Sequence, residues 1–430
     1  MGTPTKVVSV ANGGRYRPVM ARVLLILPTT SYRVGDFLDA AGALGVEVAV
    51  AAEEELPLTG LDRFVRVNLD KPQEAAAAVI ALALTTPVDA VIPVDDRGVV
   101  VAALAAEQLG LPHNPPWAAA ATRNKVMMRR ALERAEVPQP TFRVLGPADD
   151  PVGLAAEIGF PLVVKPLSLS GSRGVIRVDS SSEIEAVSER VRQINAVACH
   201  DPSEPLLLEA FVPGPEVAVE GMLDGGRLEV LAIFDKPQPL DGPYFEETIY
   251  VTPSRLHPEI VEEVVRLTAA ACAGLGLIEG PIHAELRITD GRPRLIEVAA
   301  RSIGGICGRA LKFGLLGTSL ETMILRQALG RPAHHPDVDR GASGVMMLPI
   351  PSAGTLREVT GIDKALATPG IRSVEITSTP GTYLLPVPDS DRYLGFMFAG
   401  GSTPEEVTEA LAEAHRHLRV EFDPEHPPIT

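Results

Sequence analysis

The sequence is poor in cysteine and has no long apolar run. Its 430 residues include only three cysteines, Cys199, Cys272 and Cys307, and no two of them form a C-x-x-C pair. This pattern argues against a disulfide framework and against a cysteine zinc site. No apolar run approaches the ~20 residues of a membrane span, and the first nineteen residues lack the apolar core of a signal peptide. We therefore expect a cytoplasmic protein with no membrane partner.

Positive charge is also scarce. The chain has 39 Lys and Arg residues against 55 Asp and Glu residues, a net charge of -16. This balance disfavours a nucleic-acid partner, although a local basic site can still bind an anionic small molecule. The nine histidines show no metal-ligand spacing. With 46% hydrophobic and 22% charged residues, the chain is expected to form two or three globular domains that act on a small-molecule substrate.

Residues 22–114 alternate short apolar runs (VLLIL, VEVAVA, VDAVIPV) with helical patterns. Such an alternation predicts a parallel sheet covered by helices on both faces. No G-x-G-x-x-G follows the first run, so a dinucleotide site of the Rossmann type is not supported. Thr29, Thr30, Ser31 and Arg33 lie where an open sheet binds ligands, but capping of the next helix explains them equally well.

Two further runs, IHAELRI and PRLIEVA, lie within residues 281–299. Their alternation predicts paired β-strands, and Asp290-Gly291 between them is typical of a tight hairpin turn. Each strand carries one carboxylate, Glu285 or Glu297. Because neighbouring strands lie about 4.8 Å apart, the two side chains can share one face and bind hard cations through oxygen. The alternative is an exposed hairpin with ordinary surface acids.

The residues that follow this hairpin add positive charge and free backbone. Arg301 comes four residues after Glu297, and Gly304-Gly305 let the backbone approach a ligand closely. A cation and backbone N–H groups are therefore expected beside the carboxylate pair.

A loop of small residues follows the predicted strand PLVVKP, which carries Lys165 near its end. Small side chains and accessible N–H groups can surround phosphate oxygens, and the lysine supplies positive charge. The loop residues concerned are Ser168, Ser170, Gly171, Ser172 and Gly174. A plain hairpin loop is the alternative. Upstream, a helix expected from Trp117 to Ala135 carries Lys125, which gains interest only from these later motifs.

The segment LLLEAFVPGPEVAVEG predicts a strand, a Pro-Gly bend and a further strand. Glu209 and Glu216 lie on either side of the bend. A segment that interrupts strand pairing leaves backbone groups free to bind the edge of an adenine, while nearby carboxylates can bind its amino group or a ribose hydroxyl. Isolated acids of this kind are more often ordinary surface residues.

Taken together and in this order, these motifs resemble the ATP-grasp superfamily. Within it, FDKPQPLDGPYFEETIYVTPS and IEVAARSIGG resemble the L-amino acid ligases, which join amino acids into dipeptides. The stretches GVMMLPIPSAGTL and YLGFMFAGGSTPEEVTEAL resemble their C-terminal domain. The resemblance implies an α/β ATP-grasp fold with an N-terminal parallel α/β domain, a central ATP-grasp region and a small C-terminal α+β domain.

The resemblance also implies ATP and two Mg²⁺ ions as cofactors, with Mn²⁺ as an alternative ion. Lys125 and Lys165 would contact the phosphates, and the loop from Ser168 to Gly174 would close over them. Glu209 and the backbone of Phe211 and Val212 would bind adenine, and Glu216 would bind ribose.

For the chemistry, the resemblance implies that Glu285 and Glu297 hold the two ions. Arg301 and the Gly304 backbone would hold the acyl group, and Glu247 would meet the amino group of the first amino acid. Many superfamily members have asparagine two residues after the second metal carboxylate, whereas this chain has Ala299. Water or a bidentate carboxylate would then complete the coordination.

The expected function is an ATP-dependent ligase that joins two amino acids through an acyl phosphate, with amino acids as small-molecule partners and a homodimer left open. Alternatives are a ligase for another carboxylate or amine, and a nucleotide-binding protein without catalysis. The expected organisation is an extension (1–20), an N-terminal domain (21–115), a central domain (116–335, with the glycine-rich-loop subdomain at about 140–210) and a C-terminal domain (336–430). The last either supports the central sheet or shapes the acceptor pocket.

Overall fold

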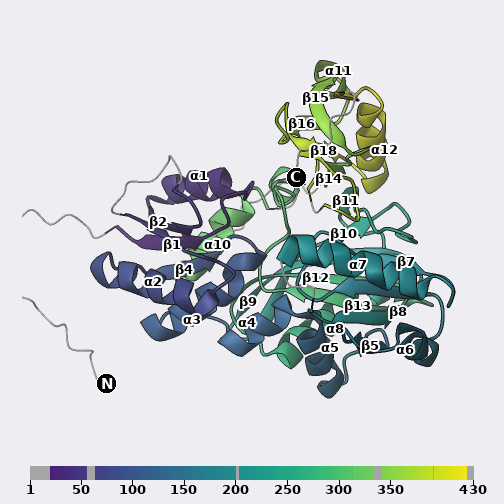
Figure 1. Ribbon diagram of the computed structural model, residues 1–430. Coiled ribbons are helices and arrows are strands. Elements are labelled where there is room, and N and C mark those ends of the chain that lie inside the picture. The colour runs from purple at the N-terminus through teal and green to yellow at the C-terminus, as the bar shows by residue number, and fades with distance from the viewer. Residues whose placement is uncertain are drawn as a thin grey trace, which may run out of the picture.

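The apolar runs at the start of the chain form the expected parallel sheet, in the order β3-β2-β1-β4. A computed structural model describes residues 20–55, 63–199, 203–314, 316–332, 341–390 and 392–423, so the expected extension lies, apart from Met20, outside the described residues. The strands of this lobe are β1 (Arg22–Ile26), β2 (Glu47–Ala52), the unexpected short β3 (Phe64–Arg66) and β4 (Ala90–Pro93). Its helices are α1 (Val34–Leu44), α2 (Pro72–Thr85), α3 (Val99–Leu109) and, from much later in the chain, α10 (Leu320–Ala328), which lies beside α1 (Figure 1).

The helix expected from Trp117 to Ala135 is two helices, α4 (Pro116–Arg123) and α5 (Lys125–Arg134). Asn124 has extended backbone angles (φ -131°, ψ 110°), and its side-chain oxygen accepts hydrogen bonds from the first N–H groups of α5. Asparagine competes for backbone groups in this way at helix starts. The break places Lys125 at the first residue of α5.

The glycine-rich-loop region forms a small antiparallel sheet in the order β5-β8-β6-β7. Its strands are β5 (Phe142–Leu145), β6 (Leu162–Pro166), β7 (Ile176–Val178) and β8 (Leu206–Ala210), with helices α6 (Pro151–Ile158) and α7 (Ile184–Cys199). The predicted strand and loop around Lys165 are thus confirmed as β6 and the β6–β7 connection.

One eight-stranded sheet runs through the rest of the molecule, in the order β13-β12-β9-β10-β11-β14-β18-β16. Its strands are β9 (Glu216–Asp224), β10 (Arg227–Lys236), β11 (Ile249–Thr252), β12 (Gly280–Thr289), β13 (Arg292–Ala299), β14 (Ala342–Leu348), β16 (Ile371–Ile376) and β18 (Gly395–Gly401). On β9, Val217 and Val219 pack with helix α8 (Pro258–Leu275), while Ala218 and Met222 pack toward the N-terminal lobe. Alternate residues therefore bury both faces.

The C-terminal segment continues this sheet, because β11 pairs with β14. It adds α9 (Arg309–Gly314), α11 (Ile362–Leu366) and α12 (Pro404–His415), and a second small sheet of β15 (Gly354–Thr360), β17 (Tyr383–Leu384) and β19 (Arg419–Phe422). Figure 1 shows α11, α12, β15, β16 and β18 in an upper lobe above the central part of the sheet. Among the residues that the structure describes, no helix combines the length and apolar character needed to cross a bilayer.

Candidate active site

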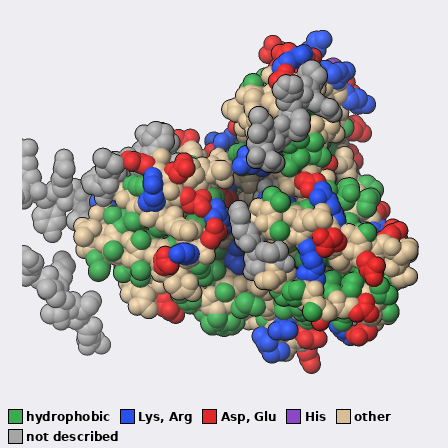
Figure 2. Space-filling model, in the orientation of Figure 1, with side chains coloured by type: hydrophobic (Ala, Val, Ile, Leu, Met, Phe, Trp, Pro, Cys, Tyr) green, Lys and Arg blue, Asp and Glu red, His purple; other side chains and the backbone are tan. Residues whose placement is uncertain are grey.

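A cleft of about 890 Å³ lies between the N-terminal lobe, the central region with its glycine-rich loop, and the C-terminal lobe. Figure 2 shows the surface hollowed there. The sequence-predicted site residues that line it are Lys125, Lys165, Ser168, Ser170, Gly171, Ser172, Glu209, Phe211, Val212, Glu216, Glu247, Glu285, Glu297, Arg301 and Gly304. Gly174 does not line the cleft, and its N–H donates to the carbonyl of Pro388 at 2.9 Å. The fold thus brings together motifs that lie up to 179 residues apart, from Lys125 to Gly304.

The hairpin of β12 and β13 has the predicted turn, but its register shifts by one residue between Leu286 and Glu285, so Glu285 does not face Ile296. Asp290 and Gly291 both have positive φ (51° and 72°), as a tight two-residue hairpin turn requires. Glu285 lies directly opposite Glu297 across the two strands. Both carboxylates face the cleft, and their side chains are 20% and 29% exposed. Two partly exposed carboxylates side by side are a donor set that suits a hard divalent cation.

The two predicted phosphate lysines differ in their surroundings. Lys125 donates to the carbonyl of Leu169 at 2.7 Å and lies 3.5 Å from Glu297. Lys165 is almost fully buried and lies 2.5 Å from the carboxylate of Glu209. Burial lowers the pKa of Lys165, although the charge of Glu209 opposes that change.

Glu209 is held by a second cation that the sequence analysis did not identify. Arg129 of α5 is fully buried, contacts Glu209 at 2.5 Å and donates to the carbonyl of Ile296 at 2.6 Å. Burial alone would raise the pKa of Glu209, but the charges of Arg129 and Lys165 outweigh burial and lower it to about 2. The sequence signal was spacing: Arg129 lies four residues after Lys125, on the same helix face.

The bend after β8 leaves fewer free backbone groups than its sequence predicted. The N–H of Phe211 donates to the carbonyl of Pro161 at 3.1 Å, and the carbonyl of Val212 accepts from Arg287 at 2.8 Å. The ring of Phe211 lies 4.3 Å from the guanidinium of Arg177. Arg287, whose guanidinium lies 5.2 Å from the same ring, lines the cleft together with Phe211 at its proposed adenine end.

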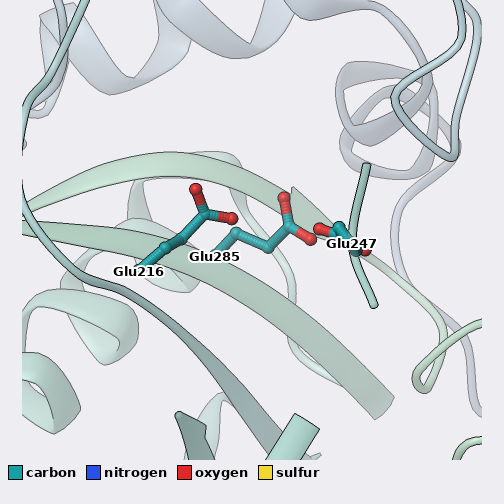
Figure 3. Close-up of side chains that lie close together, drawn as sticks. All are labelled: Glu216, Glu247 and Glu285. Carbon is teal, nitrogen blue, oxygen red and sulfur yellow. The ribbon is translucent and has the colours of Figure 1, made fainter. Parts of the chain in front are cut away.

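Three carboxylates gather at the centre of the cleft: Glu216, Glu247 and Glu285 each have an oxygen within 4.8 Å of the others (Figure 3). Glu216 and Glu285 come from neighbouring strands of the large sheet, and Glu247 from the segment before β11. Lys236 makes ion pairs with all three. Burial raises the pKa of Glu285, but the charges of Lys236 and His283 outweigh it and hold that pKa well below its usual value.

Arg301 extends toward the N-terminal lobe, where it contacts Asp96 at 2.8 Å. Burial raises the pKa of Asp96, but Arg301 and Arg123 outweigh it and lower the pKa to about 2. Beside them, Gly304 lines the cleft, and a Cβ on it would meet nothing within 4 Å. The predicted cation and open backbone thus line the same cleft as the carboxylate pair. Asp96 was not identified from the sequence.

The C-terminal lobe contributes an aromatic wall that the sequence did not predict. The ring of Phe396 lies 5.7 Å from that of Tyr32 and 6.1 Å from that of Tyr393, and all three line the cleft. A Cβ on Gly305 would come within 2.7 Å of the Phe396 ring. We call Tyr32, Tyr393 and Phe396 the aromatic wall; its members come from both ends of the chain.

The polar residues after β1 have divided roles. Thr30 and Ser31 line the cleft, whereas Arg33 is buried, contacts Glu321 at 2.8 Å and donates to the carbonyl of Val94. No side chain caps the start of α1. The structure therefore does not show the helix capping that was one of the two interpretations of residues 29–33.

Comparison with known proteins gives three family matches in chain order. They are the ATP-grasp N-terminal domain at residues 38–113, the ATP-grasp domain at 158–310 and the L-amino acid ligase C-terminal domain 2 at 346–423. Among solved structures, the chain is similar to the L-amino acid ligase from Bacillus licheniformis, with a TM-score of 0.78 and 26% identity over 94% of this chain and 99% of that one.

Among curated relatives, alanine–anticapsin ligase of Bacillus subtilis is 30% identical over 55% of this chain and 53% of its own length. Carnosine synthase 1 of Mus musculus is 32% identical over 56% of this chain and 31% of its own length. The matches therefore span about half or less of these two relatives. Together with the fold, these findings show that the chain contains ATP-grasp domains in the order found here and is similar to L-amino acid ligases.

Proposed function

We propose that the protein is an ATP-dependent ligase that joins the carboxylate of one amino acid to the amine of another, with release of ADP and phosphate. The observation that carries this proposal is the polarity of the cleft. Lys125 and Lys165 line the cleft with the small-residue loop, and Glu285, Glu297 and Arg301 line the same cleft, with Glu297 3.5 Å from Lys125. ATP phosphates fit the first group, and an activated carboxylate fits the second. The similarity to amino acid ligases supports the same reaction class.

Activation is needed because a carboxylate is a poor electrophile toward an amine. In the proposed first step a substrate carboxylate oxygen attacks the γ-phosphorus, the bond to the β-phosphate oxygen breaks, and ADP leaves. In the second step the amine attacks the acyl carbon, phosphate departs with the acyl oxygen, and the amine loses a proton. The products are an amide, ADP and phosphate.

The chain's own residues position these groups. Lys125 would bind the phosphates through donors not used by Leu169, and Lys165 would share its three donors between Glu209 and a phosphate. Arg301 would stabilise the oxyanion formed when the amine attacks. Glu247 would bind the substrate ammonium group. One of its oxygens, Oε2, accepts a hydrogen bond from the Tyr250 hydroxyl at 2.7 Å.

The carboxylates of Glu285 and Glu297 fit Mg²⁺, because both are oxygen donors, lie on opposed strands and face the cleft. A bound divalent ion would supply charge neutralisation for the triphosphate. Closure of the loop from Ser168 to Ser172 would exclude water from the acyl phosphate.

Product analysis tests this proposal. The full chain is incubated with ATP, Mg²⁺ and pairs of amino acids, and the spent nucleotide is separated by chromatography. We expect ADP and phosphate, formed only when suitable amino acids are present. Added hydroxylamine should trap a hydroxamate of the partner that supplies the carboxylate. AMP with pyrophosphate would contradict the acyl-phosphate route, and no nucleotide turnover with any pair would contradict the function.

A further inference from the structure

Lys236, the last residue of β10, is buried among the three carboxylates at the centre of the cleft. Its ammonium nitrogen lies 2.5 Å from Glu216 and 3.1 Å from Glu285, and it also pairs with Glu247. The lysine side chain is 3% exposed. The three carboxylates line the cleft, whereas Lys236 does not, so it contacts them from inside the protein.

The three carboxylates would form a metal site if the lysine were absent. Their oxygens lie within 4.8 Å of one another, a separation that lets a single divalent cation contact all three at 2.3–2.6 Å. Figure 3 shows the carboxylates of Glu216 and Glu285 side by side with Glu247 next to them. The ammonium group is within ion-pairing distance of each of them and so occupies the position that an ion would take.

The charge balance of the cluster also disfavours a divalent ion while Lys236 is present. Glu216 also pairs with Arg287 at 2.7 Å, and Glu285 lies beside His283, which pairs with Glu220. Burial lowers the pKa of His283, but the charge of Glu220 outweighs burial and raises it to about 9. With these two included, four carboxylates face three cations, and one negative charge is left over. Removal of Lys236 leaves two negative charges, which one divalent ion would balance. With Lys236 in place, a divalent ion bound to the same three Oε1 atoms would lie within a few ångströms of the ammonium nitrogen in a buried region, which is strongly unfavourable.

The carboxylates are also held independently of Lys236. The second oxygen of Glu216 binds Arg287, the second oxygen of Glu247 accepts from Tyr250, and Glu285 lies 3.5 Å from His283. The cluster can therefore keep its shape when the cation at its centre is exchanged.

We propose that the ammonium group of Lys236 is a built-in cation that excludes a divalent metal from Glu216, Glu247 and Glu285. This exclusion stands on the geometry alone. One consequence rests on the proposed function: the ions of the reaction are confined to Glu285 and Glu297, and Glu247 is kept for the substrate. Lys236 is thus a positioning residue that sets where metal binds.

The test is Mn²⁺ binding to the nucleotide-free full chain, followed by the electron paramagnetic resonance signal of the free ion. Glu297→Gln serves as the background, because it removes the other proposed ion site. In this background we expect no ion at the cluster, and one additional bound Mn²⁺ per chain after Lys236→Ala. Adding Glu247→Gln should abolish that additional ion, while Lys236→Arg should bind none.

Two results would overturn the proposal. One is an ion in the Lys236-containing background that Glu247→Gln removes; the other is a folded Lys236→Ala variant that gains no ion. If Lys236→Ala folds only with metal, recovery of its cooperative melting by Mn²⁺ supports the proposal, and failure to recover contradicts it. Because none of these measurements uses turnover, a failure here is separate from a failure of the proposed ligase activity.

Discussion

Lys165 carries two roles that can be separated by measurement. Its ammonium lies 2.5 Å from the buried carboxylate of Glu209, and it lines the cleft beside the small-residue loop. We expect Lys165→Met to weaken ATP binding by about tenfold or more, which corresponds to ~1.4 kcal/mol. It should also lower the free energy of unfolding by about 1–3 kcal/mol, because Glu209 loses one of its two cations while Arg129 remains. Calorimetry with ATP and urea unfolding measure the two effects.

The matched control is Lys71→Met, which removes a lysine from an exposed pair with Glu74. Such pairs contribute little, so neither quantity should change measurably. The two lysines differ in burial, because Lys165 is almost fully buried against Glu209 whereas Lys71 is exposed. ATP affinity unchanged in Lys165→Met would remove Lys165 from the phosphate site.

Among individual residues, those that belong to local patterns could be predicted from the sequence. Glu285 and Glu297 were found because alternation and a turn predicted two paired strands with one carboxylate each. The structure pairs the two residues, but through an unpredicted register shift between Glu285 and Leu286; from the turn alone Glu285 would face Ile296. Lys236, Arg129 and Asp96 were not found, because their partners come from other elements. An isolated lysine or arginine looks the same in sequence whether it is solvated or paired in the interior.

Among the elements, the break between α4 and α5 positions Lys125. Asn124 caps α5 by accepting from the N–H groups of Val126 and Met127 at 3.1 and 3.0 Å. We expect Asn124→Ala to cost about 1 kcal/mol of stability and to let the first turn of α5 fray. Because Lys125 is the first residue of that turn, ATP binding should weaken by about three- to tenfold. Unfolding and ATP titration measure these changes.

Asp150→Ala is the matched control for this prediction. Asp150 caps α6 in the same way, accepting from Val152 and Gly153 at 2.9 and 3.1 Å. It does not line the cleft. Loss of this cap should cost similar stability and leave ATP affinity unchanged. If both variants weakened ATP binding equally, general destabilisation would explain the effect and the positioning role of Asn124 would be wrong.

The elements themselves were largely predictable, but their pairing was not. Apolar runs and alternation identified the hairpin and the strands β1, β2 and β4 of the N-terminal lobe, but not the short β3. The prediction of one continuous helix over 117–135 was wrong, because Asn124 separates two helices. Strand β11 pairs with β14, although 90 residues separate Thr252 from Ala342. No local sequence pattern specifies which distant strand will pair with a given strand.

In the whole molecule, the three lobes are joined by charged side chains around the cleft. Arg309 contacts Asp36 of α1 at 2.8 Å and Glu375 of β16 at 2.5 Å, so one arginine links the N-terminal and C-terminal lobes. Arg301 joins the central hairpin to Asp96 in the same way. The C-terminal lobe is thus held over the cleft, where Phe396 and Tyr393 line it. This arrangement supports the interpretation that this lobe shapes the substrate pocket.

That interpretation predicts that the aromatic wall selects the amino acid side chain. Phe396→Ala would open space beside Gly305, so turnover of bulky amino acids relative to alanine should rise by about tenfold or more. Phe398→Ala is the matched control, because Phe398 is equally buried two residues along the same strand but does not line the cleft. Both variants should lose about 3–5 kcal/mol of stability, measured by denaturant unfolding. Only Phe396→Ala should change the ratio of kcat/KM between amino acids, and the same change in Phe398→Ala would contradict a pocket role for the wall.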